Sequence, residues 1–224
     1  MSRITRRACI GLTILGMSVV ALTGVAEAAP FTNGSFELPP PATSNSFGRT
    51  GTQVTGWTVT ANDVDLVATL WAPQDGSRSL DVNGLAPGTI CQTFDTTAGN
   101  SYTVGYWMSR NAAQGLASAS MTTSITGGPS QTVTHNAPWT PANPNWEFHS
   151  LAFTAGAGTS STLCFASNMA GAFGPAIDNV TIVEVVAVPL ADPRLLGIAG
   201  VIIAAFGASA AYLRRRRSPD SPMA

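Results

Sequence analysis

Apolar and polar residues alternate in short runs between residues 30 and 186, and no stretch there keeps the 3.6-residue spacing of an amphipathic helix. The runs are rich in Val, Thr, Ile, Phe and Tyr, which favour strands; Gly, Pro, Asn and Asp, which favour turns, separate them. Runs that recur about every 8–12 residues are typical of an antiparallel sandwich or barrel. The predicted strands cover residues 31–37, 54–60, 64–69, 79–82, 89–94, 101–109, 117–125, 131–135, 147–154, 161–166 and 176–185.

The start of the chain departs from this pattern. Arg3, Arg6 and Arg7 precede an apolar run at about residues 10–23, and residues 26–28 read Ala-Glu-Ala. A basic start, an apolar centre and a small-x-small cleavage site are the three parts of a secretory signal peptide. We therefore expect residues 1–28 to be a signal peptide and residues 29–187 to be exported as one β-sandwich domain.

The chain ends with a second apolar segment. Residues 195–213 carry no charge, and at about 1.5 Å per residue these 19 residues reach about 28 Å, close to the hydrocarbon thickness of a bilayer. Four arginines follow at once and mark the cytoplasmic side: Arg214, Arg215, Arg216 and Arg217. We expect a transmembrane helix at 195–213 that keeps the domain outside the cytoplasm, within a tail that spans residues 188–224.

The net charge of the predicted exported domain excludes some classes of binding partner. Residues 29–187 contain three basic and nine acidic side chains, a net charge of −6, and no lysine. Nucleic acids and anionic lipids bind clustered Lys and Arg, so neither is expected as a partner of this domain. Neutral sugars and divalent cations are compatible with such a surface.

Two cysteines, Cys91 and Cys164, remain once the signal peptide with Cys9 is removed. In an exported domain such a pair can form one disulfide. The alternative is a pair of buried thiols in apolar strands, and the sequence leaves both open.

A series of short motifs follows the predicted strands. They are NGSFE at 33–37, GW at 56–57, VDLV at 64–67, SLDVNG at 79–84, PGTICQT at 87–93 and AIDNV at 176–180. This series resembles the choice-of-anchor C family of bacterial surface proteins, which is related to a plant cell-wall family of unknown-function domains. The resemblance implies an all-β, antiparallel jelly-roll sandwich of the galactose-binding type, as in many carbohydrate-binding modules, and no established catalytic activity.

The tail carries a short motif before its apolar segment, formed by Val188, Pro189 and Leu190. With one helix, an arginine cluster and a nearby chain end, it resembles the VPL-type variants of the PEP-CTERM sorting tails. That resemblance implies cleavage by a transpeptidase-like sorting enzyme. Two departures leave a permanent anchor open: no second proline follows directly, and residues 218–224 extend past the arginines.

Two acidic residues are candidate ligands for a structural calcium ion. Carbohydrate-binding modules of the resembled type hold calcium with a first-strand Glu and a last-strand Asp, which here are Glu37 and Asp178. Paired carboxylates need compensation, and Ca²⁺ takes carboxylate and carbonyl oxygens. The alternative is that Glu37 bonds backbone amides and Asp178 caps a turn with Asn179. Asp65 and Asp81 are further candidates.

The five tryptophans divide by context. Trp57 and Trp107 lie in apolar strands and are expected in the core. Trp71 precedes the loop APQDG and Trp139 lies among prolines in the irregular segment 136–145, so both are candidates for exposure. An exposed aromatic plane beside polar groups is what a sugar site needs. We therefore predict Trp71 and Trp139 as ligand-binding residues.

Catalysis finds little support in the motifs. The only histidines, His135 and His149, lie on separate strands, and neither GxSxG nor HExxH occurs. A carboxylate pair for glycoside hydrolysis could be drawn from Asp63, Asp65, Asp75 or Glu147. The interpretation is a non-enzymatic, surface-anchored module that binds a polysaccharide or another extracellular polymer. The alternatives are an adhesive protein of a biofilm matrix and, more weakly, a glycosidase or esterase.

Overall fold

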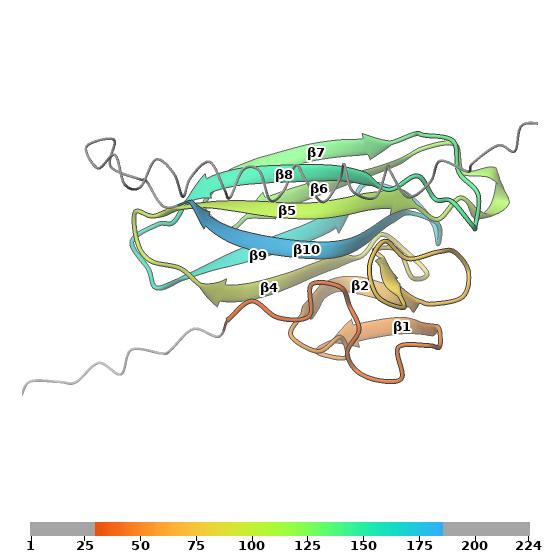
Figure 1. The fold of residues 1–224 in the computed structure, drawn as a ribbon, viewed down its shortest axis with the longest axis horizontal. Helices are drawn as coiled ribbons and strands as arrows, with labels where there is room; N and C mark the ends of the chain where they lie inside the picture. The colour runs from red at the N-terminus through yellow and green to blue at the C-terminus, as the bar shows by residue number, and fades with distance from the viewer. Residues whose placement is uncertain (1–29, 186–224) are drawn as a thin grey trace, which may run out of the picture.

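The computed structural model describes residues 30–185, which form ten antiparallel strands and one short 3-10 helix (Figure 1). All but one of the predicted strands have counterparts among the ten, and the predicted all-β class is confirmed. The elements are β1 (Ser46–Gly51), β2 (Thr58–Val67), β3 (Ser79–Asp81), β4 (Thr89–Asp95), β5 (Ser101–Arg110), η1 (Ala113–Gly115), β6 (Ala119–Ile125), β7 (Ser130–His135), β8 (Glu147–Thr154), β9 (Ser160–Ser167) and β10 (Pro175–Val185).

Hydrogen bonding joins the strands in the order β7-β6-β9-β4-β2-β3-β10-β5-β8, with β1 paired to β2. The two ends of this order approach each other, because β7 lies near β5 and β8 while β6 lies near β10. The sheet therefore folds on itself as an antiparallel sandwich that is nearly closed into a barrel (Figure 1). β10, the last strand along the chain, sits in the interior of the sheet between β3 and β5.

The core follows from strict alternation along the strands. On β6 every second residue from Ala119 to Ile125 is buried, as expected for strands with one face toward the core. Trp57, which is 1% exposed, lies among aromatic rings, with Phe31 at 5.7 Å and Phe36 at 5.4 Å between ring centroids. Its indole nitrogen donates to the carbonyl of Asn33 at 3.0 Å, so the predicted core position of Trp57 is confirmed. The same prediction is wrong for Trp107, which is only partly buried and belongs to neither core cluster.

Three sequence-based element predictions differ from the structure. Residues 31–37 form a turn, in which Asn33 and Phe36 have positive φ angles of 53° and 57°. The predicted strands 54–60 and 64–69 are largely one strand, β2. A bulge between Val59 and Ala61 shifts the register of β2 against β4 but does not end the strand. The segment 38–53, which contains none of the predicted strands, contains β1.

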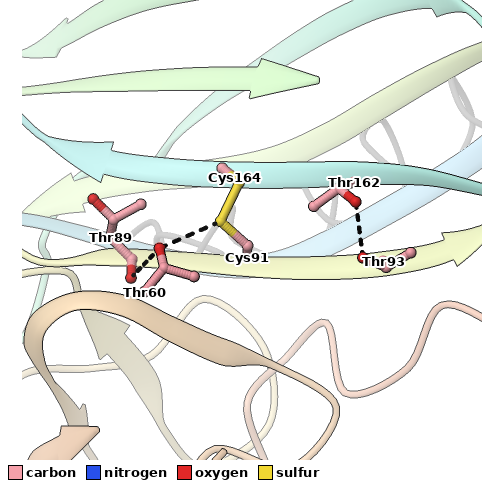
Figure 2. Close-up of a disulfide and its surroundings, with 6 residues drawn as sticks. All are labelled: Thr60, Thr89, Cys91, Thr93, Thr162 and Cys164. Carbon is pink, nitrogen blue, oxygen red and sulfur yellow. Dashed lines mark hydrogen bonds between the residues drawn. A yellow bond between two sulfur atoms is a disulfide. The ribbon is translucent and has the colours of Figure 1, made fainter. Parts of the chain in front are cut away.

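Cys91 on β4 and Cys164 on β9 form a disulfide in the structure (Figure 2). The two residues are directly opposite each other in the register of β4 and β9. They lie on the outer face of the sandwich, beside the threonine pair Thr93 and Thr162, whose hydroxyls are 2.8 Å apart. Of the two alternatives that the sequence left open, the structure has the disulfide.

Predictions for the two ends of the chain fall outside residues 30–185. These are the signal peptide at 1–28, the motif Val188, Pro189 and Leu190, the helix at 195–213 and the arginines Arg214 to Arg217. Within the described part of the chain, no helix has the length and apolar character to cross a bilayer.

Candidate functional site

Glu37, one of the two predicted calcium ligands, holds the loop that precedes β3. Its Oε1 atom accepts hydrogen bonds from the backbone amides of Ser77 at 2.9 Å and Arg78 at 3.0 Å. Gly76 lies directly against this carboxylate, since a Cβ atom there would be 2.5 Å from Oε1. A side chain larger than hydrogen at residue 76 would therefore push the carboxylate away from the amides that it binds.

Asp178 on β10 holds the other end of the same loop. Its Oδ2 atom accepts from the amides of Gln74 at 2.8 Å and Asp75 at 3.0 Å, and its Oδ1 atom accepts from Asn179 at 2.7 Å. Asp178 is fully buried, and burial raises its pKa to about 7, against the opposing effect of the three amides. The two carboxylates thus fasten residues 74–78 from two sides.

These contacts match the alternative in which Glu37 bonds amides and Asp178 caps a turn with Asn179. Five backbone amides already occupy the two carboxylates, so this donor set leaves little for a cation. Among residues 30–185, no three His, Cys, Asp or Glu side chains are grouped so as to hold a metal ion. Calcium binding by Glu37 and Asp178 stays a prediction.

Trp71 is buried in the structure, so the expectation that it is exposed is wrong. Trp71 is 4% exposed and donates from its indole nitrogen to Ser79 Oγ at 2.9 Å. Trp139 is half-buried, with its ring centroid 6.4 Å from that of Trp71. The physical reason is that the segment 136–146 folds back onto the sheet, where Pro141 accepts a hydrogen bond from Ala72 at 2.8 Å. Both tryptophans pack in a small second core with Val67, Ala176 and Trp146.

A pocket with a volume of about 260 Å³ opens beside β1 and β2. It is lined by two carboxylates, one amide side chain and several large apolar side chains. Phe47, Leu70 and Leu85 are 59%, 46% and 83% exposed, so the apolar groups form an open rim. The polar lining residues are Asp63, Asp65 and Asn111, and the large apolar ones are Phe47, Leu70, Leu85 and Phe173.

Asp63 and Asp65 reach the pocket together because residues i and i+2 of a strand share one face. Asp63 accepts the amide of Leu85 at 3.0 Å, and Asp65 accepts the amide of Gly48 at 2.8 Å. Each carboxylate is thereby fixed while it keeps free acceptor capacity. Burial raises the pKa of Asp65, although the Gly48 amide lowers it, and the charge of Asp63 raises it further.

Asp81 lies behind the pocket, opposite Asp65 in the register of β2 and β3. It is 1% exposed and accepts from the amide of Asn83 at 2.9 Å and from Nδ2 of Asn111 at 2.8 Å. Burial raises the pKa of Asp81 to about 8, and these two hydrogen bonds oppose the rise. Asn111 therefore connects a buried acid with a raised pKa to the wall of the pocket.

The raised pKa of Asp81 predicts that the protein loses stability with rising pH. The folded state keeps the Asp81 proton up to about pH 8, whereas the unfolded chain releases it near pH 4, so the free energy of unfolding falls between these values. Burial lowers the pKa values of both histidines and raises that of Asp178 to about 7, so most of the contribution of these groups lies below pH 7. Urea unfolding at pH 7 and pH 9 should therefore show the last part of the Asp81 loss in the wild type and a smaller loss in Asp81→Asn.

The matched control for this experiment is Asp95→Asn, which changes an exposed acid on β4. It should retain the wild-type difference between the two pH values. Equal pH dependence in Asp81→Asn and the wild type would show that Asp81 is not the titrating group.

Sequence reasoning found part of this site. Asp63 and Asp65 were considered only within a carboxylate pair for hydrolysis, with Asp65 also a candidate calcium ligand. The apolar rim was missed, because Phe47 lies in a Ser/Thr-rich segment and Leu85 in a short turn region. Phe47 and Leu85 could have been noticed, because a large apolar side chain in a polar loop is normally covered by a core or by a ligand.

The chain is similar in sequence to one known protein and in structure to solved carbohydrate-binding modules. Halomucin of Haloquadratum walsbyi is 32% identical over 179 residues, which cover 78% of this chain; the chain spans 2% of that relative. A solved family 16 carbohydrate-binding module is 17% identical, with a TM-score of 0.45 and coverage of 69% of this chain and 99% of that one. A family 35 carbohydrate-binding module from Clostridium thermocellum is 16% identical, with a TM-score of 0.43 and coverage of 63% and 99%.

A family model gives the more specific assignment. Residues 29–183, more than half of the chain, match the family described as "Protein of unknown function (DUF642)", and this range includes every strand that lines the pocket. The chain therefore belongs to the DUF642 family.

Proposed function

We propose that this protein is an exported, non-enzymatic module that binds carbohydrate in the pocket beside β1 and β2. The observation that carries the proposal is the combination of Asp63, Asp65 and Asn111 with an exposed apolar rim. Ligand pockets typically combine apolar walls with a few fixed polar groups. Two fixed carboxylates can accept hydrogen bonds from neighbouring sugar hydroxyls, while the rim covers the C–H surface of the ring.

The ends of the chain extend the proposal to location and partners. A signal peptide at 1–28 would export the domain, and the helix at 195–213 would hold it at a membrane until a sorting transpeptidase cleaves the tail. The disulfide between Cys91 and Cys164 is compatible with an oxidising compartment outside the cytoplasm. We further propose that the sandwich is a jelly roll of the choice-of-anchor C type, displayed toward polysaccharide or matrix polymers.

Binding is tested with the purified full chain in a mild detergent and a panel of soluble polysaccharides, read out by melting temperature and affinity electrophoresis. Asp63→Asn and Asp65→Asn keep the shape of each side chain and one acceptor oxygen but remove the charge. Because hydrogen bonds to charged groups contribute about 1.5–3 kcal/mol, each variant should weaken binding about tenfold or more. Asp95→Asn, outside the pocket, should bind like the wild type.

Two results would contradict this assignment. Unchanged binding by both pocket variants would place the site elsewhere. Failure of the folded wild type to bind any polysaccharide would favour the adhesive matrix protein instead.

Hydrolysis is the second candidate function, because Asp65 and Asp63 share one pocket and the pKa of Asp65 is raised. A carboxylic acid with a raised pKa beside a second carboxylate is the arrangement that glycosidases use. The same samples can be assayed for new reducing ends. Their release by the wild type, and its loss in Asp65→Asn, would replace binding with catalysis.

A further inference from the structure

The outer face of β8, β5 and β10 lies apart from the pocket and combines aromatic, hydroxyl and glycine residues. Phe148 and Trp107 are opposite each other in register, and Ser150, Gly105 and Thr181 form the next row. Asp178, opposite Trp107 on β10, is fully buried and does not reach the surface. Asp178 is the only charged residue in these two rows, and the loop that it holds carries the exposed Asp75.

The aromatic pair is held at a fixed height above the sheet. A Cβ atom at Gly105 would lie 3.0 Å from Cζ of Phe148 and 2.9 Å from Oγ1 of Thr181, so the Phe148 ring lies across the strand over this glycine. Trp107 and Phe148 meet edge to face, with ring centroids 5.6 Å apart and an interplanar angle of 63°. Phe148 is nevertheless 56% exposed, so much of its ring is open to solvent.

We propose that this face, which we call the aromatic platform and define by Trp107, Phe148, Gly105, Ser150 and Thr181, binds an extended neutral polysaccharide chain. A ring lying over the sheet offers apolar area to the C–H face of a sugar, and the neighbouring hydroxyls donate and accept hydrogen bonds. None of the five platform residues is charged, which favours a neutral chain, and the nearby carboxylate of Asp75 disfavours a polyanion. A sheet face is open at both sides, so an extended polysaccharide chain can lie across the strands.

The aromatic platform is a second site. The pocket is lined by residues of β1, β2 and the loops around Leu70, Leu85 and Phe173, none of which belongs to the platform. The inference shares a ligand class with the proposed function but rests on different residues, so variants can separate the two.

The test uses the full chain in detergent and measures binding to swollen cellulose, xylan and an insoluble β-1,3-glucan, with polygalacturonate as the charged comparison. Phe148→Ala removes the exposed ring, and Ser150→Glu adds a charge beside it while keeping the ring. Since burying one large apolar side chain is worth about tenfold or more in binding, each variant should weaken binding to the neutral polymer at least about tenfold. Leu38→Ala, an exposed apolar residue outside both sites, is the matched control and should not change binding.

The outcomes separate the two sites. Asp63→Asn and Asp65→Asn should retain binding to the neutral polymer if the platform binds it independently. Three results would overturn the inference: binding by Phe148→Ala and Ser150→Glu at the wild-type level, loss of the same binding in the pocket variants, or no binding of the wild type to any of the three neutral polymers. The melting temperature of each variant verifies that it is folded.

Discussion

Trp57→Ala is expected to lower the free energy of unfolding by about 3–5 kcal/mol, the range for truncating a large buried aromatic residue. Trp57 is 1% exposed and packs against Phe36 and Phe165, with ring centroids 5.4 Å and 6.1 Å away. Its removal would leave a cavity and remove one of the two hydrogen bonds that the carbonyl of Asn33 accepts, the other coming from the amide of Phe36 at 3.2 Å. Because this carbonyl belongs to the turn at 31–37, the same change would loosen the start of the domain. Urea unfolding of the full chain in detergent measures the effect.

Trp57→Phe is the control for this prediction. It keeps an aromatic ring in the core and removes the indole hydrogen bond, so its loss of stability should be clearly smaller than that of the alanine variant. A change below about 1 kcal/mol in Trp57→Ala would show that this region does not unfold together with the rest of the sandwich.

Replacing both Cys91 and Cys164 with serine should lower the free energy of unfolding by about 2–4 kcal/mol. The disulfide joins residues 73 positions apart, and its loss allows the unfolded chain many more conformations. Neither cysteine belongs to the two hydrophobic core clusters, so serine at these positions leaves the core intact. Chemical denaturation of the double variant and the wild type gives the difference.

The same two strands supply a matched control. The adjacent pair Thr93 and Thr162 links β4 and β9 by a hydrogen bond of 2.8 Å, and the double alanine variant there should change stability far less. A reductant should lower the melting temperature of the wild type and leave that of the double serine variant unchanged. An unaffected wild type would mean that the cross-link contributes little to stability.

Alternation along the chain was sufficient to locate most strands. β8 was predicted to the residue, because its exposed and its more buried residues alternate. β5 was predicted to within one residue from its run of strand-favouring residues, although both of its faces are largely buried. The prediction was wrong for residues 31–37, where Phe31 and Phe36 mimic a strand yet enter the core from a turn. It also missed β1, whose burial is slight because this strand pairs only with β2 at the margin of the sheet.

The candidate site was less predictable because it depends on long-range pairing. That Asp63 and Asp65 share a face follows from their spacing, but the register that brings Phe47 and Leu85 to the same pocket does not. The exposure of Trp71 was misjudged for a similar reason. Trp71 lies in a loop by sequence, and it is covered because the segment that contains Trp139 packs against it.

The interior position of β10 sets the order in which the domain can fold. Its neighbours β3 and β5 cannot join one sheet, and Asp178 cannot hold the loop at 74–78, until residues 175–185 are present. Pairings between distant parts of a chain form slowly, because a long loop must close before they contribute. If the chain crosses a membrane as an unfolded polypeptide, N-terminus first, this order keeps it competent for translocation. Folding would then be completed by the strand that emerges shortly before the apolar segment at 195–213.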